Sequence, residues 1–204
     1  MIILPRLYAI LDATRFPDAR AVCDFAEALV AGGLTLLQYR NKSANAREML
    51  EQSRKLKRRL LNSVQLIMND RADLCLAAGF DGVHVGQDDM SAEGARKVIG
   101  DSLALGVSTH NPKQLRIADK TSADYLAIGP VFATLAKANP DPFIGLDGVR
   151  AARALTRKPL VAIGGITRAN CGSIIEAGAD SVAVISDLLL GARKSAEEFF
   201  RILR

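Results

Sequence analysis

Short apolar runs alternate with longer amphipathic stretches along the whole chain. The runs are rich in Val, Ile and Leu and are apolar on both faces, a pattern typical of strands buried in a parallel sheet. The predicted strands are Leu7–Leu11, Leu34–Tyr39, Gln65–Asn69, Gly82–Val85, Leu103–Val107, Tyr125–Ile128, Leu160–Ile163 and Ser181–Ile185. The predicted helices are Asp18–Ala31, Ala44–Leu61, Arg71–Ala78, Ser91–Ile99, Pro112–Asp119, Leu146–Leu155, Arg168–Ala177 and Ser195–Leu203.

Eight strand–helix pairs in succession predict a (β/α)8 barrel, the TIM barrel fold, as a single domain over residues 1–204. A recurring turn supports this count, because small residues such as Ala31-Gly32-Gly33 and Ala177-Gly178-Ala179 separate a helix from the next strand. An open, doubly wound sheet is the alternative. The first strand–helix turn, however, lacks the glycine-rich phosphate fingerprint of that fold.

Polar side chains follow the second predicted strand in a regular spacing. Gln38, Arg40 and Lys42 stand two residues apart, so in an extended segment they point to one side. An amide and two cations can together bind a heterocycle and a diphosphate, since Arg offers a planar fork and Lys a compact charge. A polar loop that happens to be basic is the alternative. The C-terminal strand ends of such a barrel carry its active sites, which favours the binding hypothesis.

Two acids follow the third and fourth predicted strands. Asp70 and Asp89 lie after strands that neighbour each other about 5 Å apart in a barrel, so both can flank one hard cation such as Mg²⁺. Asp88 competes with Asp89 on spacing alone. Asp70 can instead cap the helix that follows it. Paired acids also occur in glycoside hydrolases, but the neighbouring cations favour phosphate chemistry.

Glycine-rich turns after the last two strands suggest a phosphate site. Gly164-Gly165-Ile166 precedes a predicted helix start, where backbone N–H groups and the helix dipole attract anions. Ile185-Ser186-Asp187 precedes the final helical region and offers a second such turn. Together they match the phosphate site that this architecture often carries after its last strands.

Other candidate residues fit known catalytic patterns less well. We interpret His84 as a buried histidine of the barrel wall and His110, at a strand end, as the better candidate for a polar role. Neither has a Cys or second His nearby, which argues against zinc. Ser108 has no evident base and acid partner in the sequence, so a hydrolase triad is not supported. The lysines Lys42 and Lys137 lie beyond strands, which argues against a Schiff-base aldolase.

Composition narrows the class of protein further. Half of the chain is hydrophobic (49%), which supports a substantial core and excludes disorder. The net charge of +5 gathers in Arg54–Arg59, which we interpret as a solvated helix face rather than a nucleic-acid site because aromatic residues are few. The three cysteines are widely spaced and are interpreted as small apolar fillers. No signal peptide or membrane-spanning run is recognised, so a cytoplasmic location without membrane or nucleic-acid partners is expected. A homo-oligomer is left open.

The motifs together resemble the thiamine phosphate synthase (thiamine-phosphate pyrophosphorylase) family over essentially the whole chain. The segments that carry the resemblance, in order, are Leu7–Asp12, Gln38–Lys42, Asn69–Leu74, Asp81–Asp89, Gly106–His110, Gly129–Thr134 with Lys137, Ala162–Ile166 and Val184–Ser186. The resemblance implies a (β/α)8 barrel and a transferase. It would join two small-molecule substrates, hydroxymethylpyrimidine diphosphate and thiazole phosphate, and release pyrophosphate. The resemblance also implies Mg²⁺ as the cofactor and a dissociative substitution as the mechanism.

The resemblance also implies a role for individual residues. Asp70 and Asp89 would bind Mg²⁺, which favours Asp89 over Asp88. Arg40, Lys42, Ser108 and Lys137 would be catalytic and would stabilise the departing diphosphate. The pyrimidine diphosphate would be bound by Gln38, Tyr39, Arg40, Asn41, Lys42, Asn69, Ser108 and Lys137. The thiazole phosphate would be bound by Thr134, Leu135, Ala136, Gly165, Ile185 and Ser186.

One position departs from the family pattern. Ala136 stands where the family commonly carries a hydroxyl near the thiazole phosphate. One neutral hydrogen bond is worth about 0.5–1.5 kcal/mol, so weaker thiazole binding is expected rather than loss of function. This change keeps two alternatives open: a thiazole tautomerase on the same fold, which needs neither diphosphate nor Mg²⁺, and a non-catalytic binding protein of the thiamine pathway. Residues Ala133–Ile144 are the best candidate for a lid over the site.

Overall fold

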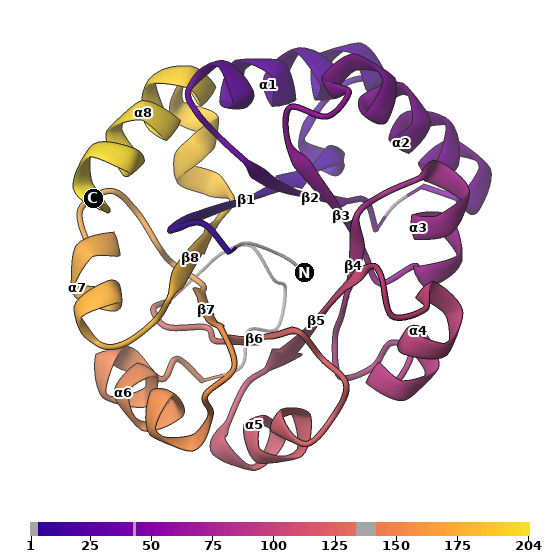
Figure 1. The fold of residues 1–204 in the computed structure, drawn as a ribbon. Coiled ribbons are helices and arrows are strands. Elements are labelled where there is room, and N and C mark those ends of the chain that lie inside the picture. The colour runs from indigo at the N-terminus through magenta and orange to yellow at the C-terminus, as the bar shows by residue number, and fades with distance from the viewer. Residues whose placement is uncertain (1–3, 43, 134–141) are drawn as a thin grey trace.

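Eight parallel strands form a closed barrel in the computed structural model of this protein, which describes residues 4–42, 44–133 and 142–204. The strands follow one another around the barrel in sequence order, and β1 closes the ring against β8 (Figure 1). Their bounds are β1 Leu7–Asp12, β2 Leu36–Arg40, β3 Gln65–Asn69, β4 Gly82–Val85, β5 Ala104–Thr109, β6 Tyr125–Ile128, β7 Leu160–Ile163 and β8 Ser181–Val184. The predicted (β/α)8 barrel is confirmed.

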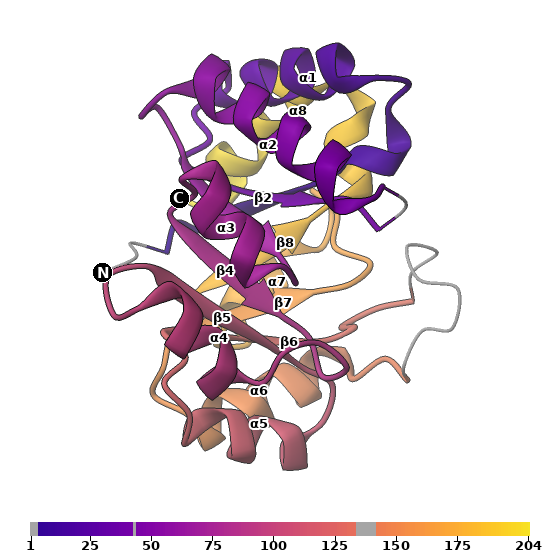
Figure 2. The same ribbon diagram turned by 90° about the vertical axis from the view of Figure 1, so that its right-hand side faces the viewer.

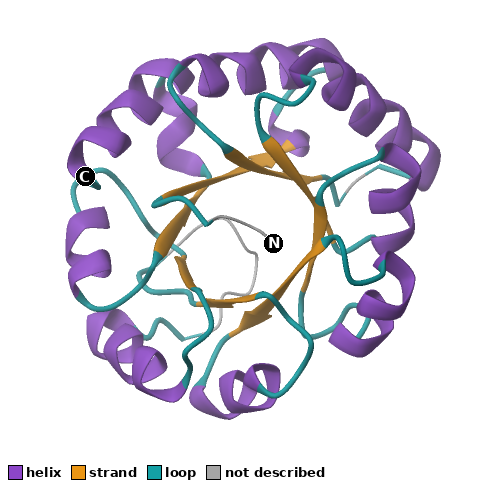
Figure 3. Ribbon diagram, viewed as in Figure 1, coloured by secondary structure: helices purple, strands orange, loops and turns teal. Residues whose placement is uncertain are grey.

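Helices surround the strands as an outer ring (Figure 3). In the described part of the chain they are α1 Ala19–Ala31, α2 Ala46–Leu60, α3 Ala72–Ala78, α4 Ala92–Ile99, α5 Pro112–Asp119, α6 Gly145–Leu155, α7 Cys171–Glu176 and α8 Ala192–Ile202. Two short 3₁₀ helices, η1 Ala13–Arg15 and η2 Ser186–Leu190, follow β1 and β8. Seen from the side, α1 and α8 lie above the strands and α5 and α6 lie below them (Figure 2). No described helix is long and apolar enough to cross a membrane.

Local chemistry determines where several helices begin. The Asp18 carboxylate accepts hydrogen bonds from the backbone N–H groups of Arg20 and Ala21 and so caps α1. Asn111 caps α5 in the same way, and Pro112 occupies the first helical position, where its missing N–H costs nothing. Because all neighbouring strands are parallel, their C-terminal ends lie on one face of the barrel.

Several predicted boundaries differ from the observed ones by one to three residues, and two of these differences have a local reason. Strand β2 begins at Leu36 rather than Leu34, because the Leu34 N–H still bonds to Leu29 O and closes the turn after α1. Helix α7 begins at Cys171 rather than Arg168. There the Asn170 side chain bonds both the Thr167 N–H and the Gly165 carbonyl, and such local bonds compete with helix formation.

The core has two layers. The larger cluster lies between the strands and the helices, and it includes the free, buried Cys23, Cys75 and Cys171. Burial raises the pKa of the Cys75 thiol to about 12, which fits the predicted role of an unreactive filler. The smaller cluster fills the barrel interior with Tyr8, Ile10, Leu36, Ile67, Ala104, Tyr125, Ala127, Val161 and Ala183. This inner layer forms the floor beneath the site described next.

Candidate active site

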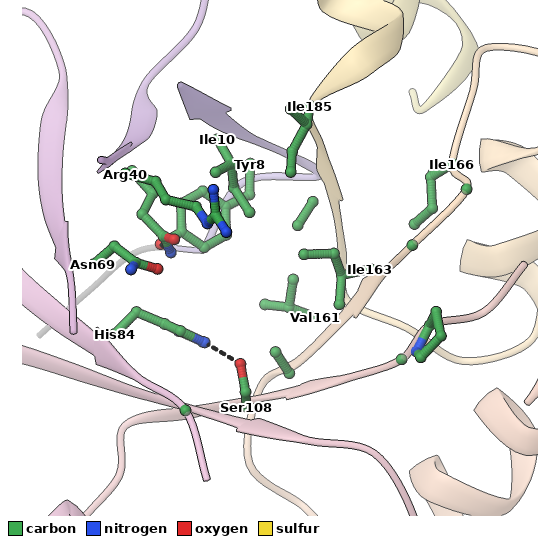
Figure 4. Close-up of a pocket in the computed structure, with 18 of the residues that line it drawn as sticks. Tyr8, Ile10, Arg40, Asn69, His84, Ser108, Val161, Ile163, Ile166 and Ile185 are labelled. Carbon is green, nitrogen blue, oxygen red and sulfur yellow. Dashed lines mark hydrogen bonds between the residues drawn. The ribbon is translucent and has the colours of Figure 1, made fainter. Parts of the chain in front are cut away.

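A cavity of about 690 Å³ opens at the C-terminal ends of the strands. Its volume lies within the range expected for a small-molecule site. Apolar side chains on or directly after the neighbouring strands β7, β8 and β1, among them Ile10, Val161, Ile163 and Ile185, form one part of its wall. Arg40, Asn69, His84 and Ser108 present polar groups (Figure 4). An apolar pocket with a few convergent polar groups is the common form of a binding site for a ring-bearing ligand.

The cationic side of the pocket comes from the end of β2. Gln38, Arg40 and Lys42 all line the cavity, as their spacing predicted. The Arg40 guanidinium donates to the Asp12 carboxylate at 2.9 Å, and this ion pair orients it. The intervening side chains take the other face of the strand: Tyr39 donates to Gln52 on α2 at 2.6 Å, and the Asn41 amide donates to the same oxygen at 3.1 Å. Tyr39 and Asn41 are not among the residues that line the cavity, and their contact with substrate stays a prediction.

The two predicted metal ligands do come together. The Asp70 and Asp89 carboxyl groups lie within hydrogen-bond distance of each other, and the Lys42 ammonium approaches Asp70 at 3.0 Å. Partial burial and the contact with Asp89 raise the pKa of Asp70, while Lys42 opposes that rise. Asp89 is anchored by the Gly86 N–H at 2.8 Å, whereas Asp88 is exposed. The geometry thus favours Asp89 over Asp88.

The alternative role of Asp70 as a helix cap is wrong. The residue at the N-terminal boundary of α3 is Arg71, and no side chain caps that end. Asp70 has a left-handed backbone (φ 63°), which Asp tolerates better than most residues, and its N–H bonds to His84 O on β4 at 2.8 Å. This turn directs the Asp70 carboxylate toward Lys42 and the cavity.

Ser108 has a histidine partner that the sequence did not reveal. His84 Nε2 lies 2.8 Å from Ser108 Oγ, and both side chains face the cavity (Figure 4). No base for Ser108 was evident in the sequence, and the folded barrel brings His84 to it from β4. The other ring nitrogen of His84 contacts the Tyr125 hydroxyl at 3.1 Å rather than a carboxylate, so the Ser-His-Asp pattern of hydrolases is not formed. Burial lowers the pKa of His84 to about 4, which keeps the ring neutral near pH 7.

The predicted phosphate turns follow β7 and β8, which lie three and two strands around the barrel from the cations of β2. Gly164 and Gly165 both have positive φ, and a Cβ at Gly165 would lie 2.6 Å from Ala133 O, so this backbone requires glycine. Ile185 and Ser186 line the same wall after β8. Because α7 begins only at Cys171, the exposed N–H groups here belong to the turn itself rather than to a helix start.

An ion pair joins these two turns. The Arg168 guanidinium donates to Asp187 at 2.8 Å, and the Arg168 backbone N–H donates to the same carboxylate at 3.1 Å. Asp187 lines the cavity beside Ser186, so without Arg168 its charge would repel a phosphate. The same guanidinium also bonds Glu198, so Arg168 offsets the charge of two acids and joins the turns that follow β7 and β8.

Some predicted residues lie outside the described part of the chain. Thr134, Leu135, Ala136 and Lys137 belong to residues 134–141, and most of the proposed lid Ala133–Ile144 lies there as well. His110, the other histidine, lines the cavity, and its Nδ1 lies 2.7 Å from Gly129 O. Its predicted polar position at a strand end is confirmed.

Comparison with known proteins decides the family. A family profile described as thiamine monophosphate synthase matches residues 7–188. The chain belongs to the thiamine monophosphate synthase family. The thiamine-phosphate synthase of Koribacter versatilis is 64% identical over 203 residues, covering 98% of this chain and 96% of the relative. That of Chloroflexus aurantiacus is 49% identical over 186 residues, covering 89% of this chain and 83% of the relative.

Solved structures agree with this assignment. The thiamine phosphate pyrophosphorylase of Pyrococcus furiosus superposes with a TM-score of 0.85 at 34% identity, covering 97% of this chain and 95% of that one. A 3-hexulose-6-phosphate synthase superposes with a TM-score of 0.73 at 17% identity, covering 98% of this chain and all (100%) of that one, and it shows the shared fold alone. Membership of the thiamine monophosphate synthase family therefore rests on sequence and on fold.

Within this family fold, sequence reasoning missed the inward-facing residues of the barrel. Tyr8, Ile10, His84 and Ile163 line the cavity although they lie within apolar runs. Alternation along each strand was the available signal: Gln38 and Arg40 face the cavity, so every second residue of the strand shares their side. The residues that meet across the barrel belong to strands far apart in sequence, and only the closed ring brings them together.

Proposed function

We propose that this protein joins hydroxymethylpyrimidine diphosphate to thiazole phosphate in the cavity at the C-terminal strand ends, forming thiamine phosphate and pyrophosphate. Its family membership makes it an enzyme, a transferase of thiamine biosynthesis, and supports this reaction over a tautomerase or a non-catalytic binding protein. The observation that carries the proposal is the pairing of Asp70 with Asp89 beside Arg40 and Lys42, across the cavity from a glycine turn.

The paired acids fit a bound Mg²⁺ ion. Burial, and then the neighbouring Asp89 carboxylate, raise the pKa of Asp70, as expected for a partly buried acid held close to a like charge. Mg²⁺ is usually bound by one or two carboxylates, with water and substrate phosphate oxygens completing its shell. The pair of Asp70 and Asp89 suits it, although no group of three or more potential metal ligands occurs among the described residues. When bound, the ion would supply charge neutralisation for the departing pyrophosphate.

The cations of β2 would bind the diphosphate. Arg40 offers a planar fork held in place by Asp12, and Lys42, paired with Asp70, adds a compact point charge. As the bond between the pyrimidine methylene carbon and the diphosphate oxygen breaks, its electron pair leaves with the pyrophosphate. Preorganised cations stabilise that growing charge without reorganisation. The thiazole nitrogen then donates its lone pair to the methylene carbon, so no protein nucleophile is required.

The apolar wall and the glycine turn would orient the second substrate. Ile163 and Ile185 provide apolar surface for a thiazole ring (Figure 4). The backbone at Gly164 and Gly165 would hold its phosphate, with Ser186 adding a hydroxyl. The two rings would thus meet between the cationic side and the phosphate turn, which brings the reacting atoms together.

The test is a reconstitution with purified protein and both substrates, with and without Mg²⁺. We expect thiamine phosphate and pyrophosphate to form in equal amounts and only when the metal is present. Isomerisation of the thiazole phosphate alone would instead show a tautomerase, and tight binding without turnover would show a binding protein. Either of these outcomes would refute the proposal.

The metal assignment has its own test in Asp70→Asn. Asn keeps the size and tolerates the left-handed backbone of Asp70, so the fold should persist while one anionic ligand is lost. We expect kcat/KM to fall about 10²–10³-fold, the scale for removing one preorganised electrostatic group. Asp73→Asn is the matched control, because Asp73 is exposed and pairs only with Arg71 among the described residues. Equal activity of the two variants would contradict the assignment.

A further inference from the structure

A chain of buried polar side chains crosses the interior of the barrel beneath the cavity. Gln38 Nε2 donates to the Tyr8 hydroxyl at 2.8 Å, and that hydroxyl lies 3.0 Å from the hydroxyl of Tyr125. Tyr125 in turn lies 3.1 Å from His84 Nδ1, and His84 Nε2 lies 2.8 Å from Ser108 Oγ. We call this set the barrel relay; its members, in order, are Gln38, Tyr8, Tyr125, His84 and Ser108.

A missing side chain makes the relay possible. Gly106 on β5 pairs with His84 on one side and with Tyr125 on the other. A Cβ at Gly106 would lie 2.2 Å from the Tyr125 ring and 2.4 Å from His84 Nδ1, closer than any real contact. The two side chains therefore meet across β5 only because that strand presents no side chain there. A glycine within a strand often marks such a close approach.

The donor in each hydrogen bond of the relay follows from the groups that have a proton to donate. The Gln38 amide nitrogen can only donate, so Tyr8 accepts from it. Either tyrosine could donate in the Tyr8–Tyr125 bond, but the buried Tyr8 proton has a partner in this chain only if Tyr8 donates to Tyr125. Tyr125 then donates to His84 Nδ1, which leaves the single proton of a neutral imidazole on Nε2. His84 donates that proton to Ser108 Oγ. Burial raises the pKa of both phenols, which keeps their protons in place.

The two ends of the relay consequently offer different groups to the cavity. Both Gln38 and Ser108 line it. The Gln38 nitrogen is used by Tyr8, so its amide oxygen is the group that can accept from a ligand. Ser108 accepts from His84, so its hydroxyl proton can be donated to a ligand. An acceptor and a donor at fixed positions suit a substrate that carries an amino group on a ring and an anionic oxygen on its leaving group.

We propose that the barrel relay is a one-way hydrogen-bond chain in which Tyr8, Tyr125 and His84 are positioning residues. They hold the Gln38 oxygen toward the amino group of the pyrimidine and the Ser108 proton toward the departing diphosphate. This inference rests on the proposed function, since it assigns its groups to the substrates named there. A purely structural network would fill the barrel without determining which end offers a hydrogen-bond acceptor to the cavity and which offers a donor.

The first test is the proton position on His84. The protein has two histidines, so ¹H–¹⁵N spectra of its imidazoles contain two ring systems, and His84→Gln assigns them. The relay requires a neutral His84 with its proton on Nε2 near pH 7. A proton on Nδ1 would mean that the whole chain runs in the opposite direction and that the Ser108 proton is consumed by His84. That result would overturn the proposal without any activity measurement.

The second test is a double-mutant cycle between Tyr125→Phe and Ser108→Ala. Tyr125→Phe keeps the ring and removes one link, so kcat/KM should fall about two- to tenfold, the worth of one hydrogen bond. In the Ser108→Ala background the same change should have an effect smaller than about twofold, because the end it orients is gone. Ser53→Ala, which removes a buried hydroxyl bonded to Met49 O on α2, is the control and should retain wild-type kinetics.

The outcomes separate the relay from the function on which it rests. If the wild-type protein forms no thiamine phosphate, the proposed function fails, whereas the proton position on His84 is still measured. If the wild type is active but Tyr125→Phe lowers kcat/KM by the same factor in both backgrounds, the relay has no directional role. Thermal unfolding of each variant shows whether it is folded, so a loss of activity through misfolding is recognised.

Discussion

The substitution Gly106→Ala tests how tightly the side chains pack in the barrel interior. In Gly106→Ala the new methyl group would lie 2.2 Å from Tyr125 Cζ, 2.4 Å from its hydroxyl and 2.4 Å from His84 Nδ1. Ordinary contacts begin near 3.4 Å, so the Tyr125 ring must move by roughly 1 Å. Tyr125 is fully buried and held by Tyr8 at 3.0 Å and by His84 at 3.1 Å, so a shift of that size breaks both hydrogen bonds.

The magnitude follows from these contacts. Overpacking a filled core costs about 1–3 kcal/mol, and each buried hydrogen bond lost adds about 0.5–1.5 kcal/mol. Replacing Gly by Ala within a strand returns about 0.5–1 kcal/mol of chain entropy. The net loss in the free energy of unfolding centres on about 3 kcal/mol. With an m-value of about 2–3 kcal/mol/M, the urea midpoint should fall by about 1 M.

The assay is equilibrium unfolding in urea followed by circular dichroism, with Gly172→Ala as the matched control. Gly172 lies in α7, where a Cβ would meet only Ile202 at 3.9 Å, so the same substitution should raise stability by about 0.5–1 kcal/mol. The two variants are expected to shift in opposite directions. If Gly106→Ala were as stable as wild type, the barrel interior would have room that the structure denies, and the packing argument for the relay would fail.

Three further predictions concern charge and shape at the site. The pKa of His84 is lowered to about 4 from 6.5, so below pH 6.5 the unfolded chain binds a proton that the folded chain does not bind. The free energy of unfolding should therefore fall by up to about 3 kcal/mol as the pH drops from 6.5 to 4. The variant His84→Gln should lose this part of the pH dependence, measured without metal. Asp12→Asn should raise the KM for the pyrimidine diphosphate several-fold, because Arg40 loses its charged anchor, while an unchanged KM would show that Arg40 needs no support. Gly165→Val should raise the KM for thiazole phosphate and leave the KM for the pyrimidine diphosphate unchanged. The reason is that Gly165 has a φ of 65° and that a Cβ there would lie 2.6 Å from Ala133 O, which leaves no room for a side chain. Equal effects on both KM values would contradict the assignment of this turn to the thiazole phosphate.

The sequence predicted much of the cationic and acidic half of the site. Gln38, Arg40 and Lys42 were recognised because their spacing matches the alternation of a strand, and they line the cavity. Asp70 and Asp89 were recognised because they follow neighbouring strands, and their carboxyl groups are in contact. In each case the prediction needs only the residues of one strand or of two consecutive strands. Consecutive strands are neighbours in this barrel, so the order of the elements already implies their pairing.

The polar interior could not be predicted in the same way. His84 was interpreted as a buried wall residue and Ser108 as lacking a base, yet the two are 2.8 Å apart. Tyr8 and Tyr125 are 117 residues apart in sequence, and their hydroxyls meet at 3.0 Å. No spacing rule reports such a meeting, because it depends on the closure of the barrel and on the gap left by Gly106.

The amino-acid sequence by itself determined the alternation of strands and helices, the family and the face on which the chemistry lies, because hydrophobic periodicity and strand-end motifs are properties of contiguous residues. Tertiary structure alone decided which inward side chains touch, since closing the ring of strands joins β1 to β8 and brings distant strands to opposite sides of one interior. Those contacts turn separate polar residues into a continuous hydrogen-bonded path beneath the cavity, and their geometry follows from packing rather than from order along the chain.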